Sequence, residues 1–192
     1  MSGSVQVVPG LSISRGIPLS EEQGIGALTL GGYVREVTER FGPLEAAVMR
    51  IGDSVERWTY ADLWDRSLEV ARALLATGVG KGTRVGILAT NRLEFLSCLF
   101  GTALAGGVAS TISTFFTASE LETVIKMAGC SVLLMERKVL KKDFAEMLAE
   151  LEPQVKTAAP GELSSTTFPF LRHVAFIDGD EPFGMIEGWS TF

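Results

Sequence analysis

The chain has few cysteines, a single histidine and no excess of basic residues. Its two cysteines, Cys98 and Cys130, lie among apolar or small residues, so they do not indicate a disulfide scaffold and are expected to be reduced and buried. The only histidine, His173, lacks the paired nucleophile and orienting group of an acyl-transfer triad. Seventeen basic residues against 23 acidic ones give a net charge of -6, which argues against a nucleic-acid partner.

Targeting and membrane signals are also missing. The first 14 residues contain no basic stretch followed by a long apolar one, as a secretory signal requires, and a cytoplasmic location is expected. Residues 95–116 carry no charge and approach the length of a membrane-spanning helix. However, this run contains Gly101, Gly106 and Gly107 and ends in serines and threonines. We therefore expect a buried helix, a turn and a strand, and no transmembrane segment.

The N-terminal third predicts a tail, a helix and a hairpin. Residues 1–27 are interpreted as a tail, and a helix over 28–41 is stopped by Gly42 and Pro43. Strands are expected at 45–49 and 55–58, joined by a turn at Gly52. A long helix follows directly, with Thr59 and Asp62 as a capping box, and Gly78 closes it.

After Gly78 the chain alternates between short apolar runs and amphipathic stretches. Strands are predicted at 84–88, 108–112, 131–135 and 173–177. The first intervening helix is expected to open at Asn91 and to bury 95, 99 and 103, and the second to open at Thr117 and close at Gly129. The third is expected to present an apolar face at 140, 144, 147, 148 and 151, and residues 153–170 to form a loop.

The predicted strands are nearly continuous apolar runs. Such runs are typical of parallel sheets whose two faces are both covered by helices. The predicted fold class is therefore α/β, a doubly wound and mostly parallel sheet covered by helices on both faces, with a small N-terminal hairpin. Residues 28–192 are assigned to one incomplete α/β subdomain.

Three segments of this pattern resemble motifs of the adenylate-forming, AMP-binding superfamily, and in particular its AMP-forming acyl- and aryl-CoA synthetases. Residues 58–63 (WTYADL) resemble the first core motif, TYxEL. Residues 78–91, from GVGKGTRVGIL to Asn91, are similar to the segment GVxxGDRVAIxxxN, and residues 106–114 (GGVASTIST) to GAVxVPLN. Order and spacing agree over about residues 30–135. The departures are Thr111 in place of proline, Ser113 in place of asparagine and Phe115 in place of arginine.

The resemblance implies an ATP-dependent carboxylic acid:CoA ligase. Its members use ATP, Mg²⁺ and CoA, forming an acyl-adenylate and then a thioester. Their phosphate-binding loop, aromatic-Gly-x-Thr-Glu motif, ribose-binding aspartate, hinge and catalytic lysine do not occur in the 192 residues. The chain is therefore interpreted as an N-terminal fragment, arising by truncation, proteolysis or a short gene, that binds no cofactor tightly and is inactive alone. No catalytic residue or metal ligand is assigned.

The resemblance also implies a CoA site on the loop after the strand at 108–112 and on the basic segment after the strand at 131–135. The candidate residues are Ser113, Thr114, Phe115, Arg137, Lys138, Lys141 and Lys142. The basic segment lies near the carboxyl end of a predicted strand, where ligands of open α/β sheets bind. Its cations suit phosphates. The alternative is that these cations form the solvated start of a helix.

Other functions remain open at this point. The chain could be a non-catalytic α/β binding or interaction module, or part of an adenylation domain that serves a carrier protein. The acid could be fatty, aromatic or sterol-like. Apolar surface that would face a missing portion favours self-association into a homo-oligomer.

Overall fold

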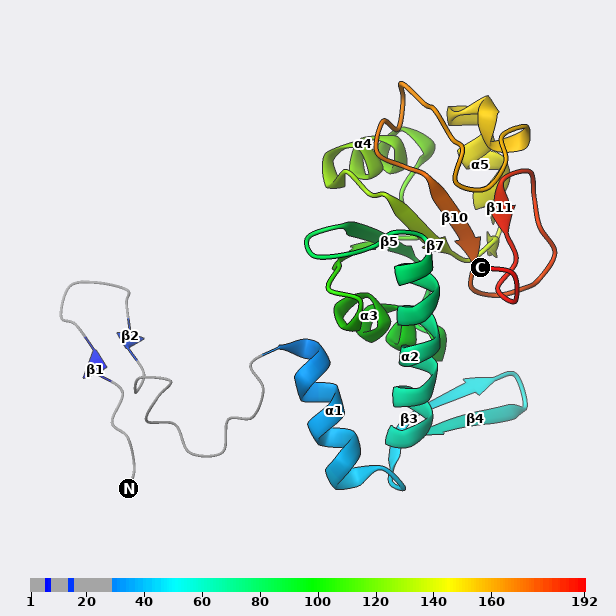
Figure 1. Cartoon of the computed structure of the whole chain (residues 1–192). Coiled ribbons are helices and arrows are strands. Elements are labelled where there is room, and N and C mark those ends of the chain that lie inside the picture. Colours follow the sequence, from blue (N-terminus) through cyan, green and yellow to red (C-terminus); the bar gives the residue numbers. More distant parts are fainter. Residues whose placement is uncertain (1–5, 8–13, 16–28) are drawn as a thin grey trace.

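A five-stranded parallel sheet forms the centre of the molecule (Figure 1). The computed structural model describes residues 6–7, 14–15 and 29–192. The sheet consists of β5 (Arg84–Leu88), β6 (Val108–Ile112), β7 (Val132–Met135), β10 (His173–Phe176) and β11 (Ile186–Glu187). Their spatial order is β11-β10-β7-β5-β6, and every neighbouring pair is parallel. The predicted tail and Leu28 lie outside the described residues, apart from β1 and β2.

Outside the central sheet, the described residues form five α-helices, one 3₁₀ helix and three small antiparallel strand pairs. The helices are α1 (Leu30–Phe41), α2 (Tyr60–Ala76), α3 (Leu93–Leu104), α4 (Ala118–Ala128), α5 (Phe144–Leu151) and the 3₁₀ helix η2 (Pro153–Lys156). The pairs are β1 (Gln6–Val7) with β2 (Ser14–Arg15), β3 (Glu45–Ile51) with β4 (Ser54–Thr59), and β8 (Lys138–Val139) with β9 (Lys142–Asp143). The expected N-terminal hairpin is β3–β4.

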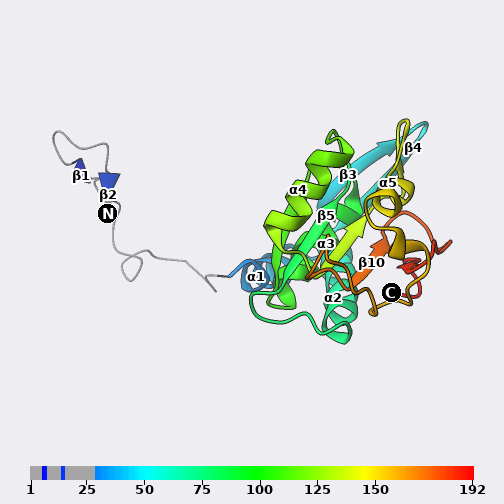
Figure 2. The same ribbon diagram turned by 90° about the horizontal axis from the view of Figure 1, so that it is seen from above.

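The side chains of the central strands alternate between two cores. Val85 and Ile87 of β5 contribute to a core with α2 and α3, whereas Leu88 contributes to a core with α4 and α5. Successive side chains of a strand point to opposite faces, so helices must cover both faces of this sheet. Figure 2 shows α4 and α5 on one side of β10 and α2 on the other. The predicted doubly wound α/β class is confirmed.

Capping residues define two of the helices as the sequence predicted. Thr59 accepts from the Asp62 amide, and the Asp62 carboxylate accepts from the Thr59 amide, which forms a complete capping box. Thr117 and Glu120 make the same box at α4. Hydrogen bonds from Thr59 and Thr117 lower the pKa of Asp62 and of Glu120, respectively. Gly129 closes α4 with φ +60, and Gly78, with φ +87, follows α2.

The start and the buried face of α3 differ from the prediction. Its N-cap residue is Arg92, not Asn91, and no side chain caps the helix. The fully buried residues are Leu93, Ser97, Cys98, Gly101 and Thr102. The residues expected to be buried, 95, 99 and 103, are only half-buried. Phe95 and Leu99 pack against the core shared with α2 at its edge, while Gly101 lies directly against Val70 and Ser67 of α2, where a Cβ atom would not fit.

Two further corrections concern the C-terminal half. Leu140 does not belong to the apolar face of α5; it lies in the β8–β9 turn and is 93% exposed. Asp143 begins α5 by accepting from the Ala145 and Glu146 amides, so the basic segment before it is a hairpin and not a helix start. The short strand β11 was not predicted, and η2 lies within the segment expected to be a loop.

The uncharged run at 95–116 forms a helix, a turn and a strand, as the sequence predicted. It contains most of α3, a turn at Gly106 with φ +80, and β6. Among the residues that the structure describes, no helix combines the length and the apolarity needed to cross a membrane.

Both thiols are buried, and their chemistry is predicted to be suppressed. Burial raises the pKa of Cys98 far above its usual value and that of Cys130 to about 11. The thiolate is the reactive form, so we expect a disulfide reagent at pH 8 to label the folded chain only through opening of the structure. Labelling should be at least about a hundredfold slower than in denaturant. Rapid labelling of the native chain would contradict this burial.

Candidate functional site

The strand order creates a switch point at the carboxyl ends of β5 and β7. From β5 the chain passes to β6 on one side and then returns to β7 on the other side. In open α/β sheets such a point is where ligands bind, because loops leaving neighbouring strands diverge there. An open pocket of about 880 Å³ lies at this edge. Its volume is in the range of small-molecule sites.

Three segments line the pocket, and apolar atoms dominate its surface. The loop after β5 contributes Ala89, Thr90 and Asn91, and the loop after β6 contributes Ser113, Thr114 and Phe115. The β8–β9 hairpin supplies the remaining wall through Val139, Leu140, Lys141 and Lys142. The structure therefore brings together five of the seven residues that the sequence nominated.

The two lysines of the pocket differ in their contacts. The ammonium of Lys142 donates to the backbone oxygens of Thr114, at 3.0 Å, and Phe116, at 2.8 Å. These bonds hold the hairpin against the loop after β6, so Lys142 is a structural part of the pocket wall. Lys141 is exposed, and no side chain among the described residues pairs with it.

The two other nominated cations lie outside the pocket lining and have partners of their own. Lys138 forms an ion pair with Asp143 across the hairpin at 3.4 Å. Arg137 forms an ion pair with Glu181 at 3.4 Å, and its guanidinium lies over the Phe176 and Phe183 rings. The apparent cluster of four positive charges in the sequence is thus dispersed in the structure.

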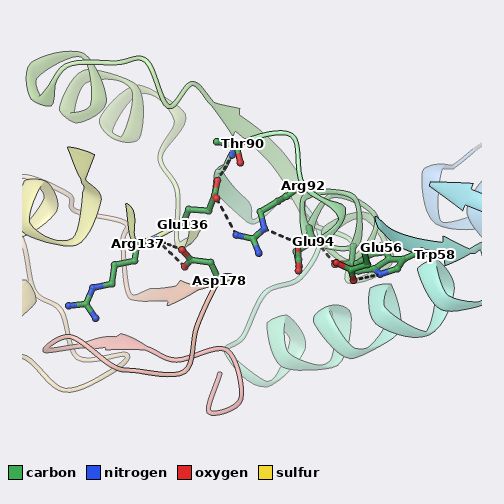
Figure 3. A network of polar contacts seen from close by, with 9 residues as sticks. Glu56, Trp58, Thr90, Arg92, Glu94, Glu136, Arg137 and Asp178 are labelled. Carbon is green, nitrogen blue, oxygen red and sulfur yellow. Dashed lines mark hydrogen bonds and ion pairs between the residues drawn. The ribbon is translucent and has the colours of Figure 1, made fainter. Parts of the chain in front are cut away.

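Glu136 was not nominated from the sequence, yet it fixes the loop that forms one wall of the pocket (Figure 3). It directly follows β7 and is 8% exposed. Its carboxylate accepts from the Thr90 amide and, at 3.1 Å, from the Arg92 guanidinium. The pairing of its own amide with Leu88 O, at 3.0 Å, is a further link to the end of β5. A lone glutamate at a strand end carries no sequence signal for this role.

Arg92 joins this network to α3. Its Nε donates to Glu94 at 2.7 Å while its Nη1 donates to Glu136. Burial has the largest single effect and raises the pKa of Glu94, but the Arg92 hydrogen bond, a backbone hydrogen bond and the charges of Arg92 and Arg66 together outweigh it, so the pKa is lowered. At the next strand end, Asp178 accepts from the Arg137 amide at 3.0 Å (Figure 3). Carboxylates after β7 and β10 therefore hold the edge of the sheet near the pocket.

Neither His173 nor the acidic residues that follow β10 form a second site. His173 Nδ1 lies 3.5 Å from Glu187 Oε2 on the adjacent strand, with no nucleophile in the pair. The carboxylates of Asp178 and Asp180 accept hydrogen bonds from the backbone N–H groups of Arg137 and Ser190, respectively. Within the described ranges no three histidine, cysteine or acidic side chains gather to hold a metal ion.

Comparisons with known proteins support the sequence interpretation. The family model for AMP-binding enzymes matches residues 34–177. The putative acyl-CoA synthetase YngI of Bacillus subtilis is 29% identical over 157 residues, which are 82% of this chain and 28% of that protein. The human mitochondrial medium-chain acyl-CoA ligase ACSF2 is 29% identical over 175 residues, covering 91% of this chain and 28% of the relative.

The fold comparison agrees. A fatty acyl CoA synthetase of Mycobacterium tuberculosis superposes with a TM-score of 0.58 and 26% identity, over 67% of this chain and 24% of that one. The chain thus spans about a quarter of the length of the relatives that it matches. The family match covers most of the 192 residues, and the chain therefore belongs to the AMP-binding enzyme family.

Proposed function

We propose that this chain is the N-terminal portion of an ATP-dependent carboxylic acid:CoA ligase. The whole enzyme converts a carboxylic acid and ATP to an acyl-adenylate and then transfers the acyl group to CoA. The observation that carries the proposal is the family match over residues 34–177, together with relatives that are acyl-CoA ligases. The 192 residues contribute the parallel sheet and the pocket at its switch point.

The 192 residues by themselves are proposed to be inactive. Several hydrogen-bond donors or cations must surround a phosphoryl group to stabilise the negative charge that develops on it during transfer. At the pocket the described residues offer two cations, Lys141 and Lys142, and Lys142 already donates to the backbone oxygens of Thr114 and Phe116. We therefore expect no AMP from ATP with the isolated chain, whichever acid is supplied.

A chimera tests the proposed role directly. Residues of this chain replace the matched 157-residue stretch of YngI, and pyrophosphate, AMP and thioester are measured with a panel of carboxylic acids. We expect the chimera to form AMP only when acid and ATP are both present, and thioester only when CoA is added. The isolated chain and unaltered YngI serve as matched controls.

Two outcomes would contradict the proposal. AMP formation by the isolated chain would show that the missing portion is not needed. A chimera that melts cooperatively but forms no adenylate would favour a non-catalytic binding module. Cooperative melting must be shown in each case, because an unfolded chimera would be inactive for an unrelated reason.

The CoA role of the seven nominated residues stays a proposal of its own. It is supported by the position of Ser113, Thr114, Phe115, Lys141 and Lys142 at the switch point. The fit of the site to CoA is poor, however, because CoA carries several phosphate charges. Only one ammonium at the pocket lacks a partner among the described residues.

A further inference from the structure

We infer that the outer edge of β6 pairs antiparallel with the same strand of a second copy of this chain, which joins two five-stranded sheets about a twofold axis. β6 ends the strand order β11-β10-β7-β5-β6, and among the described strands only β5 lies beside it. This association is independent of the proposed function, because it involves no reaction and no substrate. Three features of β6 support it: the direction of its backbone groups, the lack of the usual protection of a sheet edge, and its uncharged side chains.

The backbone groups of β6 alternate between β5 and the open side of the strand. The Val108 amide donates to Thr83 O at 2.8 Å, and Val108 is paired with Arg84 in a continuous parallel register. The N–H and C=O of one residue point to the same side of a strand, and those of the next residue point to the other side. The backbone groups of Ala109 and Thr111 are therefore directed away from β5, and no strand of the described residues lies on that side.

The edge of β6 lacks the protection that sheet edges commonly have. Charge, proline, a bulge or a very short strand usually prevents an open edge from pairing with another chain. The opposite edge of this sheet, β11, has only two residues, and one of them is Glu187. The strands β3 and β4 carry an ion pair between Glu45 and Arg57. In contrast, β6 has the sequence VASTI, with neither charge nor proline, and its register with β5 shows no bulge.

Thr111 keeps a backbone donor at a position where proline would remove it. The motif that β6 resembles, GAVxVPLN, has proline in the place of Thr111. Proline has no N–H, and it is tolerated on an edge strand where the N–H faces away from the sheet. The outward direction of the Thr111 N–H means that a proline would fit here without the loss of a bond to β5. In this chain both outward residues of β6 can donate as well as accept.

The partner that this edge fits best is a second copy of β6. In an antiparallel pair centred on Ser110, Ala109 lies opposite Thr111 of the second copy, and each such pair exchanges two N–H···O bonds. A twofold axis brings like side chains together, so a charged strand would repel its own copy. Residues 95–116 carry no charge, which removes that repulsion. The same lack of charge gives an acidic or basic peptide no opposite charge to recognise on this strand.

Exposed apolar side chains near the start of β6 add to the contact. Val108 is 49% exposed. The start of α1 lies against Leu104, the last residue of α3, shortly before β6 begins, and Leu30 of α1 is 55% exposed. Covering such side chains removes hydrocarbon from water. Because the paired segment is short, we expect a reversible dimer with a Kd on the order of 100 µM.

Sedimentation equilibrium of the 192-residue chain, from about 5 to about 500 µM, measures this association. We expect a monomer–dimer equilibrium. Amide hydrogen exchange then locates the contact. Exchange at Ala109 and Thr111 should slow about threefold at the upper concentration, because their N–H groups gain partners only in the dimer. Exchange at Ser110 should not change, because its N–H faces β5 in both states.

Substitutions on β6 separate pairing from folding. Thr111→Pro should weaken the dimer at least about tenfold, because each copy loses a donor at the edge. It should shift the midpoint of denaturant unfolding little, whereas Ser110→Pro should destabilise the fold, because the Ser110 N–H faces β5. Val108→Lys should weaken the dimer at least about threefold, because an ammonium replaces apolar surface beside the edge. Val48→Lys is its matched control, since Val48 is 46% exposed on β3, in a different sheet.

Four results would overturn the β6 contact. The first is a chain that stays monomeric up to about 500 µM. The second is a dimer that Val48→Lys abolishes and Thr111→Pro leaves intact, which would assign the contact to the β3–β4 hairpin. The third is a loss of folding stability in Thr111→Pro as large as that in Ser110→Pro, which would contradict the outward direction of the Thr111 N–H. The fourth is a dimer of the isolated chain that is lost in the active YngI chimera, which would assign the edge to the remaining portion of the enzyme.

Discussion

Replacing Gly101 with valine is expected to lower the free energy of unfolding by about 4 kcal/mol, and replacing it with alanine by about 2 kcal/mol. Gly101 lies on the face of α3 that contacts α2. A Cβ atom added there would lie 2.6 Å from Val70 Cβ and 2.9 Å from Ser67 O. Such distances force the two helices apart. Alanine is the better helix former by about 1 kcal/mol, which offsets only part of this cost.

Denaturant unfolding of both variants checks this expectation. Gly80→Ala is the matched control, because nothing lies within 4 Å of its added Cβ atom and its φ is ordinary. The control should lose no stability, since alanine also restricts the unfolded chain. If Gly101→Ala were as stable as the control, the close contact between α2 and α3 would be wrong. The denaturant dependence should be unchanged if only the native packing is affected.

The same contact explains why sequence analysis misplaced the buried face of α3. Periodicity predicted burial at 95, 99 and 103, because those positions carry apolar or small side chains at helical spacing. Phe95 and Leu99 do pack against a core but are only partly buried, and the fully buried positions are Leu93, Ser97, Cys98, Gly101 and Thr102. The buried Thr102 hydroxyl has a hydrogen-bond partner within the helix, because it donates to Cys98 O at 2.7 Å. Hydrophobicity does not reveal a face that is selected by close backbone approach.

The bounds of two strands and the caps of two helices were predictable because their causes are local. β5 and β6 coincide with their predicted ranges, since each is bounded by turn residues. The capping boxes at Thr59 and Thr117 depend on residues three positions apart. In contrast, the two residues of β11 pair with β10 across a loop, and nothing in their own sequence indicates a strand.

The candidate site was predictable only in its position. The topology places the loop after β6 and the hairpin after β7 at the same edge of the sheet, as the βα rhythm suggested. The partners of the cations were not predictable. Lys142 binds carbonyls 26 and 28 residues away, and Glu136 binds Thr90 at a separation of 46 residues. Such pairings depend on tertiary register, which a single sequence does not specify.

Replacing Arg92 with methionine is expected to lower the free energy of unfolding by about 4 kcal/mol, and Glu136→Ala by about 2 kcal/mol. The asymmetry follows from the connectivity of the network. Without Arg92, two carboxylates lose their cation, and their side chains are only 25% and 11% exposed. Without Glu136, Arg92 still pairs with Glu94 at 2.7 Å. The double variant should be less destabilised than the sum of the single ones.

The pH dependence of the Arg92→Met defect distinguishes lost charge pairing from lost packing. The pKa of Glu94 is lowered in the folded chain, so its stabilisation is present above the unfolded pKa of about 4.3 and is lost as the pH falls through the folded value. Without Arg92 the Glu94 carboxylate loses the contacts that lower its pKa while its burial remains, so it can protonate, and the defect should shrink between about pH 6 and pH 4. A defect constant over that range would mean that Arg92 acts through its hydrocarbon stem.

The exposed pair of Lys156 and Glu146, each about half exposed, is the control: Glu146→Ala should change stability by no more than about 0.5 kcal/mol. We therefore expect the ion pair at the switch point to matter more than a surface pair, because its partners are mostly shielded from water that could replace the lost contact.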